Sequence, residues 1–183
     1  LCLRDGRFQV QVVWRDFKGA IGAGNALQFR STNETGLFWF FSPSNLELMI
    51  KVLDGGPLNG SLWTFYGALT NVEYWATVTD MHAGARRIYY NPPGELCGRG
   101  DTQAFVSKEV PGAPAPSPAA ASYLTQVTDP CGPDALCLGG GRFKLELDWR
   151  VPWTGKTGRG VAVPGTADTG FFWFFDADRK STR

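Results

Sequence analysis

The chain has 183 residues and a formal net charge of +1, from 18 Lys and Arg residues against 17 Asp and Glu residues. This balance gives no electrostatic attraction to nucleic acid or to anionic surfaces, so nucleic acid is not an expected partner. The single histidine, His82, excludes a three-histidine zinc site, and no apolar run approaches the roughly 18 residues that span a bilayer. We therefore expect no metal, no cofactor and no membrane span.

Alternating apolar residues predict a series of short strands between residues 1 and 106. The first strand, residues 7–15, places Phe8, Val10, Val12 and Trp14 on one face. The other predicted strands cover residues 37–41, 46–52, 61–66, 72–78, 86–90 and 102–106. About seven strands with turns between them are typical of an antiparallel β-sandwich, so the fold class is all-β and residues 1–106 are predicted to form one complete module.

The opening of the chain recurs near its end. Leu1-Cys2-Leu3, Gly6-Arg7-Phe8 and Trp14-Arg15 return at residues 136–138, 141–143 and 149–150, and residues 35–41 return as residues 169–175. The first copy continues past this aromatic block to Phe105, whereas the second stops at Arg183. We therefore expect residues 131–183 to be a partial second copy. The Pro- and Ala-rich residues 107–130 are predicted to be a semi-rigid linker.

These blocks resemble a recurrent β-rich module that occurs in tandem in secreted bacterial proteins. The shared pattern includes the Leu-Cys-Leu opening, the Phe-Trp-Phe-Phe block, residues 47–55 (ELMIKVLDG) and residues 65–74 (FYGALTNVEY). The resemblance covers residues 1–106 and again 136–178. It implies a secreted, extracellular setting and tandem use, and it implies no activity or catalytic residue.

Four cysteines, Cys2, Cys97, Cys131 and Cys137, form no Cys-x-x-Cys zinc motif and are expected to form disulfides. One pairing joins Cys2 to Cys97, which would tie the two ends of the module together, and joins Cys131 to Cys137 in a small local loop. In the alternative, Cys2 pairs with a cysteine upstream of residue 1, because the first copy begins too late to include a counterpart of Cys131.

Three aromatic side chains are candidate binding residues. Trp75 alternates with the inward residues of its strand and is expected to point outward, either to bind a ligand or to be covered by a loop or a neighbouring module. Trp39 and Phe41 share one face of residues 37–41. They either form a platform for a flat ligand such as a sugar ring, or belong to a central strand that is covered on both sides.

No nucleophile–base pair, carboxylate pair or metal cluster can be assembled from the sequence, so we expect no enzyme; a carbohydrate-active enzyme is the least favoured reading. The favoured hypothesis is an extracellular binding or adhesion module with a glycan or protein ligand. The alternative is a structural subunit of an extracellular fibre. Both rest on an incomplete second copy that exposes strand edges and apolar side chains, so that it self-associates into a homo-oligomer or filament or packs on the first module. The predicted assembly residues are Phe171, Phe172, Trp173, Phe174 and Phe175.

Overall fold

The computed structural model describes residues 1–28, 32–108 and 131–174, which belong to two compact units. Unit 1 spans Leu1–Tyr123 and unit 2 spans Leu124–Arg183. The fold is all-β, as predicted: the only helix in the described part of the chain is α1 (Gly56–Asn59), a single turn. Most of the predicted linker, from residue 109 to residue 130, lies outside the described residues.

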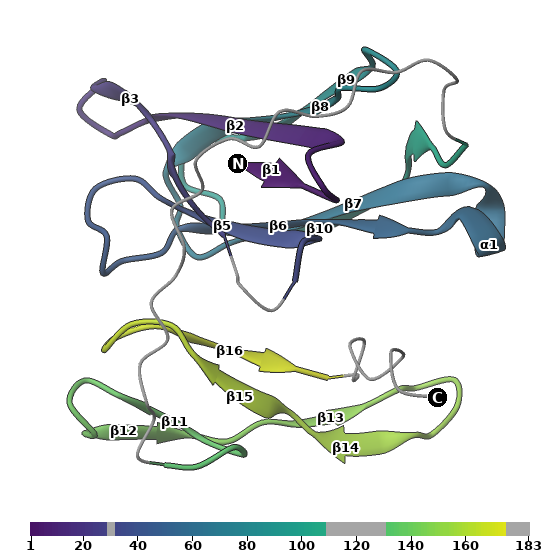
Figure 1. Ribbon diagram of the computed structural model, residues 1–183. Coiled ribbons are helices and arrows are strands. Elements are labelled where there is room, and N and C mark those ends of the chain that lie inside the picture. Colours follow the sequence, from purple (N-terminus) through teal and green to yellow (C-terminus); the bar gives the residue numbers. More distant parts are fainter. Residues whose placement is uncertain (29–31, 109–130, 175–183) are drawn as a thin grey trace. The chain divides into compact units, whose positions relative to one another are not determined.

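Unit 1 contains two five-stranded antiparallel sheets, which Figure 1 shows as two layers. Sheet A has the order β1-β2-β8-β9, with β3 also paired to β2; its strands are β1 (Cys2–Leu3), β2 (Phe8–Arg15), β3 (Ile21–Ala23), β8 (Glu73–Asp80) and β9 (Arg86–Asn91). Sheet B has the order β10-β7-β6-β5-β4. Its strands are β4 (Asn25–Gln28), β5 (Thr35–Trp39), β6 (Leu48–Asp54), β7 (Ser61–Ala68) and β10 (Gly98–Val106).

The core of unit 1 lies between these sheets and follows the predicted alternation. Sheet A contributes every second residue of β2 and β8, and sheet B contributes residues such as Phe38, Ile50 and Leu62. All seven predicted strands are present, and three short strands, β1, β3 and β4, are additional. The result is a β-sandwich-like module whose inner faces are apolar and whose outer faces are mixed.

Two ion pairs fasten β2 to β8, one at each end of this strand pair. Arg7 donates from Nη2 and Nε to the Asp80 carboxylate, at 2.9 Å for the Nη2–Oδ2 contact, and both side chains are largely buried. Arg7 also donates to the carbonyl oxygens of Val106 and Ser107, which connects the pair to the end of β10. At the opposite end, Arg15 Nε donates to the buried carboxylate of Glu73.

Unit 2 contains three two-stranded antiparallel pairs. They are β11 (Leu136–Leu138) with β12 (Phe143–Leu145), β13 (Asp148–Arg150) with β14 (Thr157–Arg159), and β15 (Val161–Pro164) with β16 (Gly170–Trp173). The register of β11 on β12 places Leu138 opposite Phe143, and β1 on β2 places Leu3 opposite Phe8 in the same way.

Two further contacts of unit 1 occur again in unit 2 at corresponding positions. Trp14 lies opposite Gly22, and its indole N–H donates to a backbone carbonyl at 3.2 Å; Trp149 lies opposite Gly158 and makes the same kind of bond at 3.3 Å. A side chain at either glycine would overlap the tryptophan ring, so the residue opposite each ring must be glycine.

The cysteine prediction is half right. Cys131 and Cys137 form the predicted local disulfide; Cys137 lies within β11, and Cys131 precedes the first residue of this strand by five positions. The predicted Cys2–Cys97 bridge is wrong, because both thiols are free. Cys2 lies on β1, at one edge of sheet A, whereas the Cys97 thiol donates to Asn91 Oδ1 at the end of β9, the opposite edge. Three strand spacings amount to about 14 Å, far beyond the roughly 7 Å limit between bridged Cα atoms.

Candidate functional site

Unit 2 exposes apolar side chains on β12 whose counterparts in unit 1 are buried. Phe143 and Leu145 are 55% and 41% exposed, whereas Phe8 and Val10 are 0% and 1% exposed. In unit 1 the Phe8 ring packs 5.1 Å from that of Phe105 in sheet B, and β2 is also paired along its whole length with β8. In the described residues of unit 2, β12 pairs only with β11 and β13 only with β14, and no counterparts of β6 to β10 are present. We call the exposed surface of Leu138, Phe143 and Leu145 the open face.

A hollow of about 720 Å³ lies over the open face. Arg142, Lys144 and Asp168 line it beside the three apolar side chains. An apolar floor with charged groups at its border is typical of a surface that another polypeptide covers. Among the described residues, unit 2 has no counterpart of Phe105, whose ring packs on that of Phe8 in unit 1.

The predicted assembly residues lie on or next to β16. Phe171, Phe172 and Trp173 are half-buried on this strand, and Phe174, directly after it, is 47% exposed. Phe40, the counterpart of Phe174, is only 4% exposed. In unit 1, β5 lies between β4 and β6, whereas β16 pairs only with β15 within the described ranges. Phe175, the fifth predicted residue, lies outside the described residues.

Two arginines flank the apolar residues of β12 and β13, and the sequence interpretation did not single them out. Arg142 and Arg150 stand where unit 1 has Arg7 and Arg15, and both are exposed. The Arg142 guanidinium lies 5.3 Å from the centre of the Phe143 ring, the same distance that separates Arg7 from the Phe8 ring. The repeated Gly-Arg-Phe and Trp-Arg blocks were the signal that could have found them.

A second candidate surface is the outer face of sheet A around Trp75. The Trp75 ring stacks on Tyr90 at 5.3 Å between centroids, and the Arg15 guanidinium lies 5.7 Å from the Trp75 ring. The Tyr90 hydroxyl donates to Glu73 at 2.8 Å. Trp75 therefore points outward as its alternation predicted, and it stays half-buried because Tyr90 and Arg15 border it.

The charges at this surface are mutually fixed. The hydrogen bond from Arg15 holds the pKa of the Glu73 carboxyl below its usual value, even though burial acts in the opposite direction. The same carboxylate raises the pKa of Tyr90, because it accepts the hydroxyl proton in a hydrogen bond. The face therefore presents a stacked aromatic pair beside an ion pair that persists at neutral pH.

Trp39 and Phe41 do not join Trp75 in one site. Trp39 ends β5 in sheet B, whereas Trp75 lies on β8 in sheet A. Phe41 is exposed and packs edge-on against Trp14, with ring centroids 4.7 Å apart. Because β5 lies between two strands and both Leu37 and Phe38 are buried, the central-strand interpretation of residues 37–41 fits the structure.

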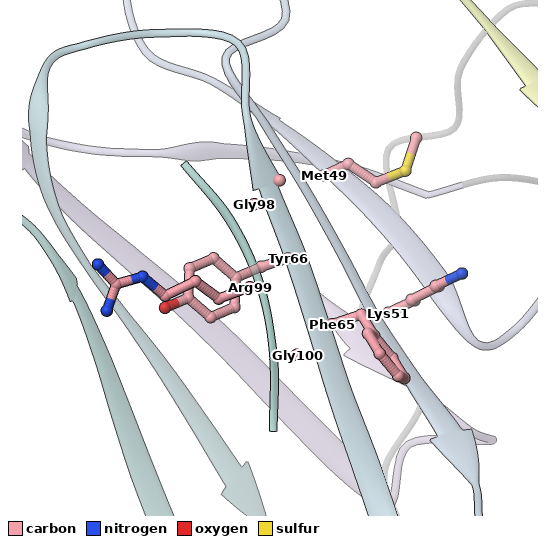
Figure 2. Close-up of a pocket in the computed structure, with 8 residues that line it drawn as sticks. Met49, Lys51, Phe65, Tyr66, Gly98, Arg99 and Gly100 are labelled. Carbon is pink, nitrogen blue, oxygen red and sulfur yellow. The ribbon is translucent and has the colours of Figure 1, made fainter. Parts of the chain in front are cut away.

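The structure also contains a shallow pocket in sheet B, of about 360 Å³, that the sequence interpretation missed. Its floor includes Gly67 and Gly98, which pair with each other across β7 and β10. Lys51 Nζ lies 5.5 Å from the centre of the Phe65 ring at its wall. Figure 2 shows Lys51 and Phe65 on one side of the strands and Tyr66 and Arg99 on the other. A pocket floored by backbone leaves no motif in the sequence.

In the described ranges, no group of three or more His, Cys, Asp or Glu side chains is arranged to hold a metal ion. None of the helices in that part of the chain has the length and apolar character needed to cross a membrane. Comparisons with protein-family models, with curated proteins and with solved structures gave no match.

Proposed function

We propose that the chain is a non-catalytic extracellular binding module that assembles with another polypeptide by strand complementation at unit 2. The observation that carries this proposal is the contrast between Phe143 and Leu145, which are exposed, and Phe8 and Val10, which are buried at the corresponding positions of unit 1. The Cys131–Cys137 disulfide supports an oxidising, extracellular setting.

Unit 2 corresponds to the first five strands of unit 1. Its three strand pairs match the pairings of β1, β3, β4 and β5, with β12 and β13 together in the place of β2. The counterparts of β6 to β10 are missing from the described residues of unit 2. Their absence leaves unpaired backbone N–H and C=O groups along strand edges, and such edges accept an added strand from another chain.

Covering the open face, together with Phe174, would stabilise the assembly appreciably. Complete burial of a large apolar side chain contributes about 1.5–3 kcal/mol. Phe143, Leu145 and Phe174 are each about half exposed, so each would gain roughly 1 kcal/mol on burial. Backbone hydrogen bonds along the added strand contribute further, roughly 0.5–1.5 kcal/mol for each bond.

The best-supported partner is a polypeptide that supplies the second half of a module of this type. In the described residues, unit 1 contains both halves of a module and unit 2 contains a first half. A copy that donates its β6 to β10 uncovers its own β1 to β5. Self-association into a homo-oligomer or fibre, as predicted from the sequence, requires two open faces to cover each other and is the second candidate.

Complex formation tests the proposal. We expect the full chain to form a one-to-one complex with a separate polypeptide of residues 45–106, measured by size-exclusion chromatography with light scattering. Phe143→Ser should weaken this complex at least about tenfold, because loss of the buried ring costs more than about 1.4 kcal/mol. Phe17→Ser, at an exposed phenylalanine in the turn after β2, is the matched control and should have no effect.

Two outcomes would change the conclusion. If the full chain remains a monodisperse monomer and binds no second-half polypeptide, strand complementation is refuted. If the full chain instead forms oligomers without the added polypeptide, and Phe143→Ser converts them to monomers, a second copy of the chain is the partner.

A ligand-binding role for the Trp75 face is a further candidate, favoured by the outward-facing stack of the half-buried Trp75 on Tyr90 beside a fixed ion pair. Such faces bind flat apolar surfaces, including those of sugar rings. Pull-down with a panel of insoluble polysaccharides would test it. Trp75→Ala should abolish retention, and Trp153→Ala, at a tryptophan 85% exposed in unit 2, should not. Equal retention of both variants would remove the role.

A further inference from the structure

We infer that the strand which completes unit 2 carries two carboxylates seven residues apart, one facing Arg142 and the other facing Arg150. This inference rests on the proposed strand complementation and specifies the chemistry of the partner. It follows from the way in which unit 1 satisfies the two equivalent arginines.

In unit 1, the neighbour of β2 has a carboxylate at each end. β8 runs antiparallel to β2, with Asp80 opposite Phe8 and Glu73 opposite Arg15. Asp80 accepts hydrogen bonds from Arg7, and Glu73 accepts one from Arg15. Both carboxylates are nearly inaccessible to solvent, so each needs its arginine to remain charged in place. The two ion pairs therefore fix the register of β8 on β2.

Unit 2 retains both arginines. Arg142 and Arg150 have the same separation as Arg7 and Arg15, and the apolar residues between them alternate in the same way: Phe143, Leu145, Leu147 and Trp149. The ion pairs recorded in the described part of unit 2 are Lys144 with Glu146 and Arg159 with Asp148, and neither includes Arg142 or Arg150. Arg142 and Arg150 are thus two exposed cations at the two ends of the segment formed by β12 and β13.

Charge favours an acidic partner strand over a second copy of the same edge. When two copies pair antiparallel in the register that matches all of their apolar residues, Phe143 lies opposite Trp149 of the other copy. Arg142 then lies beside Arg150 of the other copy at both ends of the pair, and like charges in opposite positions are destabilising. A strand of the β8 type places a carboxylate at each of these ends instead.

The side chains that would lie opposite Leu145 and Leu147 further specify the partner strand. Val10 and Val12 of unit 1 are replaced by Leu145 and Leu147 in unit 2, and each leucine is one methylene larger. Val78 and Ala76 lie opposite these valines in unit 1. The partner strand should therefore carry residues no larger than Val and Ala at the same two positions, because extra volume in a packed core is destabilising.

Charge reversal with matched rescue tests this register. The probe is a fluorescein-labelled synthetic peptide of residues 71–91, which contains the sequence of β8 and β9, and its binding to the full chain is followed by fluorescence anisotropy. Arg142→Glu in the chain should weaken binding about 30-fold or more, as expected when one partner of a desolvated ion pair is lost. The peptide with Asp80→Lys should restore binding to that variant, and the peptide with Glu73→Lys should not. Arg150→Glu should show the opposite preference.

Lys18→Glu is the matched control, because Lys18 is an exposed lysine in the turn after β2 of unit 1 and does not line the hollow over the open face; it should change binding less than about threefold. Binding that is indifferent to the charges of the peptide, or a loss that the matched peptide does not restore, overturns the two-carboxylate inference while strand complementation stands. If no peptide binds, and the chain is monomeric and does not bind the polypeptide of residues 45–106, both the two-carboxylate inference and strand complementation are overturned.

Discussion

Truncation of two corresponding phenylalanines should have very different effects on the two units. Phe8 is completely buried, and its ring lies 5.1 Å from that of Phe105 in sheet B. Phe8→Ala removes a core side chain and should lower the free energy of unfolding of unit 1 by about 3–5 kcal/mol. Phe143 is more than half exposed, so Phe143→Ala should lower that of unit 2 by only about 1 kcal/mol.

The partner strand should remove this difference. With residues 45–106 bound, Phe143 acquires the environment of Phe8, and Phe143→Ala should then cost about 3 kcal/mol or more. Hydrogen exchange followed by mass spectrometry measures both values in one chain, because peptides from β2 and β12 report separately on the two units. The first comparison is made at a concentration at which light scattering finds the free chain monomeric.

One result would refute this reasoning. If Phe143→Ala costs as much as Phe8→Ala in the chain alone at low concentration, Phe143 is already covered within a single chain. The open face would then be no acceptor, and the exposure on which the proposed function depends would be wrong.

Three further predictions concern ion pairs and thiols. Asp80→Asn should destabilise unit 1 by about 3–5 kcal/mol in urea unfolding, because it leaves Arg7 buried without a carboxylate, and a cost below about 1 kcal/mol would contradict a structural role for the pair. The pKa of Glu73 is lowered in the folded chain, so the contribution of this carboxylate to stability is present above the usual pKa of a glutamate and is lost as the pH falls. Glu73→Gln should therefore have a lower melting temperature than the wild type at pH 7, and the difference between the two melting temperatures should disappear below about pH 4. Alkylation without reductant should label the thiols of Cys2 and Cys97, and alkylation after reduction should label Cys131 and Cys137 as well. Reduction should lower the free energy of unfolding of unit 2 by about 2 kcal/mol and leave that of unit 1 unchanged. If no thiol is labelled before reduction, a bridge between Cys2 and Cys97 would again be the better interpretation.

Local sequence pattern was enough to predict the strands of unit 1 but not all of its contacts. Strict alternation revealed β2, β6 and β8, since each buries one face and exposes the other. β1, β3 and β4 contain too few residues to show a period, so they were not predicted. The local Cys131–Cys137 loop was predictable from spacing, whereas the Cys2–Cys97 pairing required the order of strands in sheet A, which spacing does not contain.

The candidate site was predicted in part for the same reason. The aromatic block of β16 stood out as a run of large apolar residues. The exposed pair on β12, Phe143 and Leu145, looked like any half-buried strand, because its pattern matches that of the buried pair on β2. In the described residues, Phe143 and Leu145 differ from Phe8 and Val10 because no counterparts of β6 to β10 lie next to them. The neighbours of a strand are a property of the tertiary arrangement, which local alternation does not contain.

Comparison of the two units distinguishes the structure that the first half of this fold adopts alone from the contacts that the second half contributes. Trp149 meets Gly158 and β11 meets β12 in the registers seen in unit 1, although β12 and β13 have no counterpart of β8 beside them in the described residues. The hairpins are therefore encoded locally. In unit 1 the second half buries the apolar face and supplies the carboxylates that pair with Arg7 and Arg15. A surface that keeps its shape before its partner arrives spends little conformational entropy on binding. The short disulfide loop before β12 restrains it further. Under the proposed strand complementation, unit 2 acts as a preformed acceptor, and its affinity should depend chiefly on how well the arriving strand matches the apolar alternation and the two charges.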